Sequence, residues 1–311
     1  MKDTARTSPP GLEGWLARSP LNADLVLLLV CAVWGSTFVV IKVGLTNTLP
    51  FNFVATRFAV GFLVFLFLTG SRLRALSGRE VLRGILMGLL LIAGYVTQTV
   101  GLSLTTASKA GFITGLSVVL VPLFARFLLG HRIGWGVAGG VGLATVGLGL
   151  LSLTPDLRPE PGDLWVLACA FAFAGHILAV AELSRSCDPL RLALVQTGVV
   201  ALGGGLLALL FEGGLALPSG PGLLATLYTG ILGTGLVLGL QIPAQKYTSP
   251  SHAALIFSAE PVFAALFAAA LLAERLGPKE LAGGALILAG MLLAELTREP
   301  AKPEGRAGNG D

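Results

Sequence analysis

Long apolar runs separated by short polar segments make up most of this chain. A helix needs about 20 mostly apolar residues to cross a bilayer. Since backbone polar groups must bond within the segment when lipid surrounds it, and the short alternating segments of a barrel are missing, each run is expected to be a helix. The ten expected spans are Asp24–Leu45, Phe51–Thr69, Val81–Leu102, Ala107–Leu129, Gly134–Leu151, Leu164–Leu183, Leu192–Phe211, Leu223–Ile242, Ala253–Leu272 and Leu281–Leu296.

The composition supports a membrane protein and argues against most other classes. The chain is 54% hydrophobic and 12% charged, with a mean hydropathy of +0.83, whereas a soluble domain carries about 25% charged residues. The net charge of +4 does not indicate nucleic-acid binding, because no basic stripe with interleaved aromatic residues is present. Cys31, Cys169 and Cys187 lack the spacing of metal ligands, so neither metal nor cofactor is expected.

The basic residues predict how the helices are oriented. With the N-terminus in the cytoplasm, fifteen of the 21 Lys and Arg residues fall in cytoplasmic segments, five fall outside, and Arg57 lies within the second span. This bias agrees with the positive-inside rule for ten spans and two cytoplasmic ends. We therefore expect a multi-pass protein of the inner (plasma) membrane. The polar first residues lack a signal-peptide pattern, so the first span is expected to target the chain and to remain.

The chain also repeats itself at a spacing of about 143 positions. Ser108, Phe124 and Gly140 align with Ser251, Phe267 and Gly283, and Gln98 aligns with Gln241. Each half then holds five spans, and an odd number of spans inverts one half relative to the other. The predicted fold is an all-α membrane protein with ten transmembrane helices, arranged as two inverted five-helix repeats around a central cavity. Such repeats are typical of secondary transporters, whose substrate site lies near the middle of the membrane.

This plan predicts five regions along the chain. They are a cytoplasmic tail at 1–22, a first repeat at 23–152, an external connector at 153–163, a second repeat at 164–297 and a disordered cytoplasmic tail at 298–311. A monomer is compatible with this plan, and the sequence leaves the oligomeric state open.

Several short motifs resemble one family. They are Trp34-Gly35-Ser36-Thr37-Phe38, Ala55-Thr56-Arg57-Phe58, Gly101-Leu102 followed by Thr105-Thr106-Ala107-Ser108-Lys109-Ala110, Glu260-Pro261-Val262 and Ala273-Glu274-Arg275. Together they resemble the drug/metabolite transporter superfamily of the EamA type, over residues 23 to 297. The resemblance implies ten helices in two inverted bundles and transport of small metabolites, often export of amino acids. His131 departs from the pattern, since Glu274 stands at the matching place in the second half.

Two charged residues inside the expected spans are candidates for coupling or gating, because polar groups in lipid are expensive to retain. Arg57 can be a counter-charge for an anionic or carboxylate substrate, or it can snorkel outward or pair within the bundle. Glu260, directly before Pro261, can carry a proton or accept a substrate ammonium group, or it can be a protonated carboxyl bonded to a neighbouring helix.

Other polar and aromatic residues are candidates for binding substrate. Trp34, Ser36 and Thr37 share the middle of the first span and can line a cavity or simply pack. His176 lies mid-span and can carry protons, or it can be a neutral side chain bonded to a neighbouring hydroxyl. Ser258 joins this set because it lies close to Glu260.

Tyr95 and Gln98 lie nearly on one face of the third span, three residues apart, and Gln241 is the repeat partner of Gln98. These side chains can contact substrate, or the glutamines can bond across helices.

Three other function classes remain as alternatives. An intramembrane enzyme lacks support, because the chain has no His-Glu-x-x-His motif, and a phosphate-binding loop for ATP is missing as well. A channel would need a ring of filter residues, usually built by oligomer symmetry. Export of hydrophobic cations is the main alternative among transporters, although the first span carries no glutamate. The sequence leaves substrate identity, direction and energy source open.

Overall fold

The computed structural model describes residues 15–16, 19–129, 134–152, 160–184, 186–245, 247 and 256–297. Most of the expected tails at 1–22 and 298–311, most of the expected connector at 153–163 and the loop with His131 lie outside the described residues.

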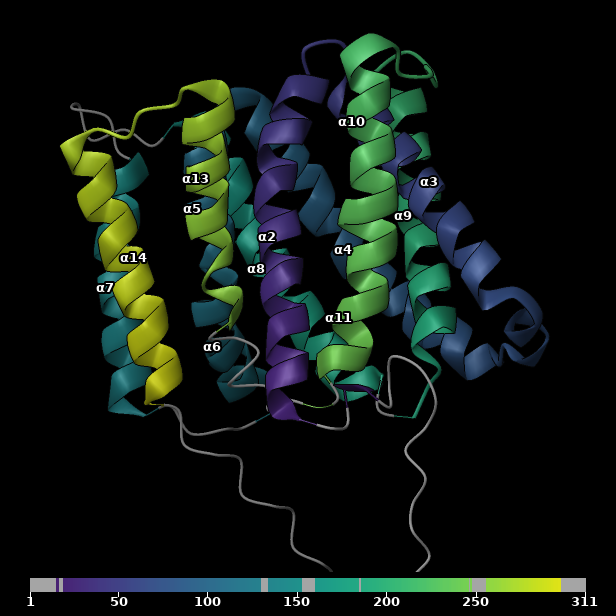
Figure 1. Cartoon of the computed structure of the whole chain (residues 1–311), viewed down its shortest axis with the longest axis horizontal. Helices are drawn as coiled ribbons and strands as arrows, with labels where there is room; N and C mark the ends of the chain where they lie inside the picture. Colours follow the sequence, from purple (N-terminus) through teal and green to yellow (C-terminus); the bar gives the residue numbers. More distant parts are fainter. Residues whose placement is uncertain are drawn as a thin grey trace, which may run out of the picture.

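Within these ranges all regular structure is helical, and the long helices run side by side along one direction (Figure 1). The N-terminal half contains α2 (Pro20–Gly44), α3 (Pro50–Thr69), the 3-10 helix η1 (Gly70–Ala75), α4 (Gly78–Leu104), α5 (Ala107–Gly115), α6 (Ser117–Leu129) and α7 (Trp135–Ser152). The C-terminal half contains α8 (Pro161–Leu183), α9 (Pro189–Phe211), α10 (Gly220–Gly230), the π-helix η2 (Ile231–Leu236), α11 (Val237–Gln245), α13 (Glu260–Leu272) and α14 (Pro278–Leu296).

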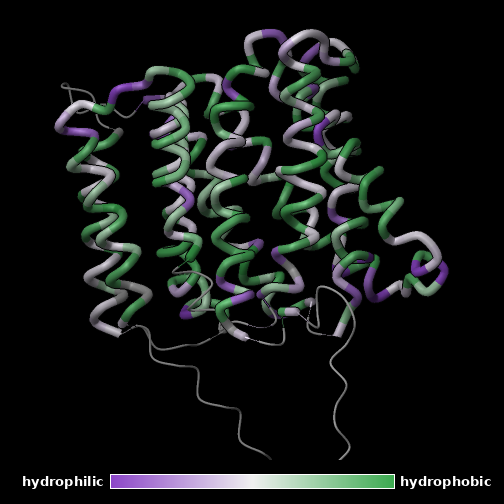
Figure 2. Tube along the Cα trace, in the orientation of Figure 1, coloured by the Kyte–Doolittle hydropathy of each residue, from purple (hydrophilic) through white to green (hydrophobic). Residues whose placement is uncertain are grey.

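The described helices have the surface of a multi-pass membrane protein. Seven helices or continuous helix runs are long and apolar enough to cross a bilayer, and Ala138–Leu151 and Glu260–Leu272 are shorter apolar helices. Figure 2 shows hydrophobic residues along the middle of the bundle and hydrophilic residues gathered at its two ends. Large side chains such as Phe67, Leu202 and Trp135 are exposed on the outside, where lipid tails can cover them.

Local sequence signals set where these helices begin. Proline occupies the first turn of α2, α3, α8 and α9, where its missing N–H costs nothing. The Ser19 side chain accepts a hydrogen bond from the backbone N–H of Leu21. At the start of α4, Ser77 and Glu80 form a capping box, which satisfies two backbone donors at once. The short polar linkers thus end one helix and start the next.

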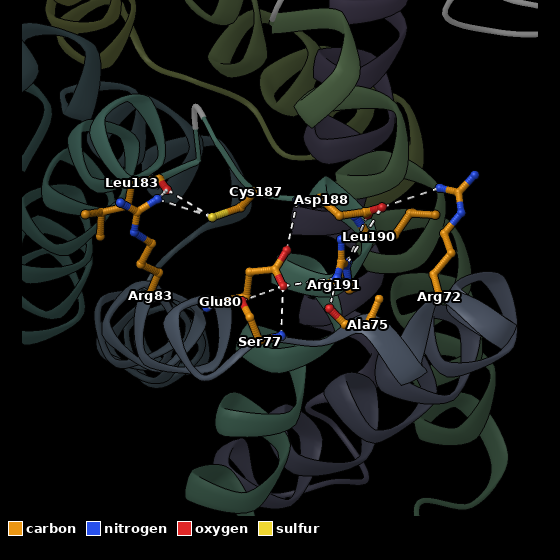
Figure 3. Close-up of polar contacts among 10 residues, drawn as sticks. All are labelled: Arg72, Ala75, Ser77, Glu80, Arg83, Leu183, Cys187, Asp188, Leu190 and Arg191. Carbon is orange, nitrogen blue, oxygen red and sulfur yellow. Dashed lines mark hydrogen bonds and ion pairs between the residues drawn. The ribbon is translucent and has the colours of Figure 1, made fainter.

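A charged cluster joins the two halves at the edge where α2 begins and α14 ends (Figures 1 and 3). The buried Glu80 carboxylate accepts from the backbone N–H of Ser77 at 3.0 Å and of Asp188 at 3.2 Å. It also lies 3.1 Å from Nη1 of Arg191 in an ion pair. Since a mostly buried charge is costly unless it is paired, this cluster fixes the start of α4 against the start of α9.

Two carboxylates of the C-terminal half cap helices of the N-terminal half at the opposite edge. Glu212, just after α9, accepts from the backbone N–H groups of Phe51 at 2.7 Å and Asn52 at 2.8 Å in α3. Glu274, just after α13, accepts from the backbone N–H groups of Ala107 and Ser108 in α5, each at 3.0 Å. Negative charge at a helix N-terminus is favourable, so these contacts tie the halves together.

Glycines allow α2 and α5 to approach α13 closely. A Cβ placed on Gly35 would lie 2.5 Å from Cβ of Phe263, and one on Gly111 would lie 2.5 Å from Cβ of Ala264. Both distances are too short for real atoms. Small residues permit such close crossings in membrane bundles, and these crossings bring α13 against the middle of the protein.

We predict that Gly35→Ala destabilises the protein by about 1–3 kcal/mol, the usual cost of overpacking a tight core. Gly142→Ala is the matched control, because a Cβ at Gly142 in α7 meets nothing within 4 Å. The control should unfold at the same temperature as the parent protein or slightly above it. Thermal unfolding in detergent measures both variants, and equal melting temperatures would contradict the close crossing.

Candidate functional site

Irregular backbone occurs at three places within the described helical bundle. α5 and α6 meet at Leu116, the π-helix Ile231–Leu236 separates α10 from α11, and a turn at Ser258–Ala259 precedes α13. Irregular backbone at membrane depth is tolerated only where protein buries it or where it lines a cavity. The interruptions therefore indicate a polar interior shared by these elements.

A cavity of about 80 Å³ lies among the interrupted helices and α2, α3, α4 and α8. This volume is room for several water molecules. Its polar and charged lining side chains come from both halves of the chain and are Thr37, Arg57, Gln98, Thr114, Ser117, His176, Gln241 and Glu260. Its aromatic lining residues are Trp34, Phe38, Tyr95, Phe173 and Phe257. The site is thus a small polar chamber with aromatic walls.

The cavity brings together all but two of the residues predicted as candidate site residues. Trp34, Thr37, Arg57, Tyr95, Gln98, His176, Gln241 and Glu260 line it.

Ser36 and Ser258 lie elsewhere. The Ser36 hydroxyl lies 2.7 Å from the Tyr228 hydroxyl and donates to the carbonyl of Val33 at 2.6 Å, so it joins α2 to α10. Ser258 lines a separate groove of about 510 Å³, whose other walls are mostly apolar and include Leu25 and Val262. The break before α13 turns Phe257 and Glu260 toward the cavity and Ser258 away from it.

Arg57 is held on several sides within the bundle. Its side chain is 1% exposed. Nε donates to the Thr234 hydroxyl at 3.0 Å, and Nη2 donates to the carbonyl of Gly233 at 3.4 Å. The guanidinium carbon lies 4.6 Å from the ring centroid of Tyr95, a cation–π distance. Within the described part of the chain, no carboxylate lies within 4.0 Å of Arg57.

Glu260 is the first residue of α13, directly after the turn. A carboxylate in the first turn of a helix is favoured by the helix dipole. The side chain faces the same cavity as Arg57. The site thus contains one group that can carry negative charge and one cation, and they come from different halves of the chain.

Hydrogen bonds hold two further polar side chains. Nε2 of His176 lies 2.9 Å from Oε1 of Gln196 on α9. An amide oxygen only accepts, so this assignment places the proton on Nε2. The partner of His176 is thus an amide and not the neighbouring hydroxyl considered from the sequence. Nε2 of Gln98 donates to the Thr114 hydroxyl at 3.3 Å, which links α4 to α5.

Aromatic contacts cross between the halves beside these polar groups. The Tyr95 ring packs edge-on against Phe58 and Phe173, with centroid distances of 4.6 Å and 5.1 Å. The Trp34 ring lies 5.9 Å from Phe257, and its Nε1 donates to the carbonyl of Gly233 at 3.2 Å. These rings give the cavity an apolar wall that suits an apolar or aromatic part of a ligand.

Several lining residues, including Thr114, Ser117 and Phe257, are not among those predicted from the sequence. The internal repeat carried a signal for them. Pairs of cavity residues stand 143 positions apart, namely Gln98 with Gln241, Thr114 with Phe257 and Ser117 with Glu260. The interruption at Leu116 stands at the same distance from Ala259 in the second turn.

Among the residues that the structure describes, no group of three or more His, Cys, Asp or Glu side chains is placed to hold a metal ion.

Comparison with known proteins links this architecture to transporters. The model of the EamA-like transporter family matches residues 21–153 and again residues 160–296. An "uncharacterized transporter" of Archaeoglobus fulgidus is 36% identical over 89% of this chain and 86% of its own length. The "uncharacterized inner membrane transporter YedA" of Escherichia coli is 27% identical, over 91% of this chain and 94% of its own length.

A further relative carries a substrate class in its name, and a solved structure shares the fold. A "probable amino-acid metabolite efflux pump" of Salmonella typhimurium is 29% identical over 86% of this chain and 92% of its own length. A protein of known crystal structure superposes with a TM-score of 0.66 at 23% sequence identity, covering 89% of this chain and 98% of the other. At that identity the superposition supports the fold alone.

Proposed function

We propose that this chain, which belongs to the EamA-like transporter family, exports an amino acid or a closely related metabolite by alternating access. One observation carries this proposal: Arg57 and Glu260, from different halves, face one cavity in the middle of the bundle. A guanidinium suits the carboxylate of a zwitterion, and a carboxylate suits its ammonium group. The relative named as a probable amino-acid metabolite efflux pump supports the same substrate class.

The proposed arrangement is ten membrane-crossing helices in two inverted sets of five. The family model matches the chain twice, and cavity residues recur at a constant spacing between the two matches. The start of α2 and the end of α14 lie at one edge of the bundle (Figure 1), as an even number of crossings requires. Interrupted helices around a central site are a feature of many secondary transporters.

The cavity must widen to accept a metabolite, because its present volume of about 80 Å³ is room for only several water molecules. Rocking of one half against the other would open it to each side in turn. We assign the protein to the inner membrane with both ends in the cytoplasm. The basic-residue bias and the name of the Escherichia coli relative support this assignment.

Export of a lipophilic cation is the second candidate. Glu260 lies in the same chamber as the aromatic rings of Trp34, Tyr95 and Phe257, which is a suitable environment for an organic cation. Arg57 argues against it, because a buried positive charge repels a cationic ligand.

The topology predicts that both chain ends face the cytoplasm. Single cysteines introduced as Ser8→Cys and Gly308→Cys, after Cys31, Cys169 and Cys187 are replaced by alanine, should both resist an impermeant maleimide in intact cells. Thr46→Cys, in the linker between α2 and α3, should react and serves as the positive control. Labelling of only one chain end would contradict ten crossings.

The substrate class predicts saturable exchange of amino acids with apolar side chains. Purified protein should melt at a higher temperature in the presence of L-phenylalanine, because a ligand of the folded form stabilises it. Proteoliposomes loaded with unlabelled L-phenylalanine should accumulate the labelled compound by counterflow. Tetraphenylphosphonium is the comparison ligand, and stabilisation by this cation with none by any of the twenty amino acids would support the second candidate instead.

Coupling is predicted to depend on Glu260. Glu260→Gln should abolish uptake driven by a pH gradient, because an amide cannot exchange a proton at this position. Glu280→Gln in the first turn of α14, outside the cavity lining, is the matched control and should behave as the parent protein does. If the Glu260 variant kept its dependence on the pH gradient, Glu260 would not carry the proton.

A further inference from the structure

The π-helical segment Ile231–Leu236 packs directly against Arg57. Nε of Arg57 donates to Oγ1 of Thr234 at 3.0 Å, and Nη2 donates to the carbonyl of Gly233 at 3.4 Å. The same carbonyl accepts from Nε1 of Trp34 at 3.2 Å. Short π-helical stretches are rare and are found frequently at functional sites. In this protein the stretch presents a hydroxyl and a carbonyl to one buried guanidinium.

Thr234 differs from two other buried threonines of the C-terminal half. Thr229 and Thr197 each donate to the carbonyl four residues earlier in their own helix, at 2.7 Å. That bond is the usual one for a threonine inside a helix. The bond that the structure gives the Thr234 hydroxyl comes instead from Arg57, on a different helix. Thr234 is fully buried, so this contact is shielded from water.

Close packing fixes the position of Thr234. A Cβ placed on Gly61 of α3 would lie 2.7 Å from Cγ2 of Thr234, so the methyl group fills the space that this glycine leaves. A Cβ placed on Gly233 would lie 2.7 Å from Cγ2 of Thr37 and 3.6 Å from Nη2 of Arg57. A β-branched side chain is already stiff about χ1. The hydroxyl therefore has little freedom to turn away from Arg57.

These contacts use one edge of the guanidinium, at Nε and Nη2, and its carbon Cζ lies 4.6 Å from the centroid of the Tyr95 ring. A guanidinium has five N–H donors in a planar fork. The remaining donors can be directed to a ligand in the cavity that Arg57 lines. A fork held in this way can meet a carboxylate with two parallel bonds.

We propose that Thr234 is a positioning residue, whose hydroxyl holds the Arg57 guanidinium in the orientation that binds the carboxylate of the substrate. This inference rests on the proposed function, because it takes the substrate to be an amino acid. Thr234 lies outside the cavity lining and would thus contribute indirectly to selection for a carboxylate. A ligand in which an amide replaces the carboxylate would gain little binding free energy from the fixed Arg57 guanidinium.

The test compares Thr234→Val, which keeps the methyl packing and removes the hydroxyl, with Thr234→Ser, which keeps the hydroxyl. Thr229→Val is the matched control, since Thr229 is equally buried and bonds within its own helix. Binding of L-phenylalanine and of L-phenylalaninamide to the purified proteins is measured by calorimetry. The valine variant at 234 should bind L-phenylalanine about tenfold more weakly, as expected for loss of a hydrogen bond to a charged group. Its affinity for the amide should change less than twofold, and the serine variant and the control should match the parent protein.

Two results would overturn the proposal: unchanged binding of L-phenylalanine by Thr234→Val, or an equal loss for both ligands, which would indicate a general structural defect.

If the parent protein bound neither compound, the proposed amino-acid function would be wrong. The positioning of Arg57 by Thr234 would then be tested by the rate at which a reagent modifies the Arg57 guanidinium. Phenylglyoxal should then modify Arg57 several-fold faster in Thr234→Val than in the parent protein or in Thr234→Ser, as read by peptide mass spectrometry. The exposed Arg79 serves as the internal standard, and an unchanged rate at Arg57 would refute the positioning role.

Discussion

Backbone N–H and C=O groups within a bilayer have no water to bond, and this constraint organises the whole molecule. It makes the apolar runs helical, and it allows the backbone to depart from a regular helix only where other protein groups satisfy it. The breaks at Leu116, at Ile231–Leu236 and at Ser258–Ala259 all adjoin one cavity. At the π-helical segment the partners are known, since Gly233 accepts from both Trp34 and Arg57. The departures from regular structure thus create the polar interior that transport requires.

The two halves carry different side chains at related positions, and this difference places positive charge on one side of the cavity only. Arg57 and Gln196 each stand seven residues after the proline that begins their helix, Pro50 in α3 and Pro189 in α9. Arg57 carries a charge and lines the cavity, whereas Gln196 is neutral and bonds to His176. A fully symmetric pair of arginines would repel each other across a small chamber. The asymmetry leaves Arg57 as the one Lys or Arg side chain among the described residues that line the cavity, as the proposed binding of a carboxylate requires.

The sequence predicted the helical class well, because the apolar runs are long and proline and serine mark where helices start. It also predicted most of the candidate site, since a polar side chain that is retained in a membrane span requires a partner. It did not predict that Ser258 turns away from the cavity, because the turn before α13 changes which side chains face inward. Nor did it find Thr234, whose importance comes from a π-helical segment that lies beside Arg57 only in three dimensions. The glycines at 230, 233 and 235 were a usable signal for that segment.

Carboxylates at the two edges of the bundle hold the halves together, so their contacts affect how the central cavity can open. Glu212 and Glu274 tie the C-terminal half to the starts of α3 and α5 at one edge, and Glu80 ties α4 to the start of α9 at the other (Figure 3). The rocking motion proposed above would require contacts at one edge to separate while those at the opposite edge persist. Each contact is a charge-assisted bond between a carboxylate and backbone N–H groups, which water can replace once the edge is exposed. The edges can therefore exchange these bonds with water, whereas the contact between Arg57 and the fully buried Thr234 is shielded from water in the present arrangement.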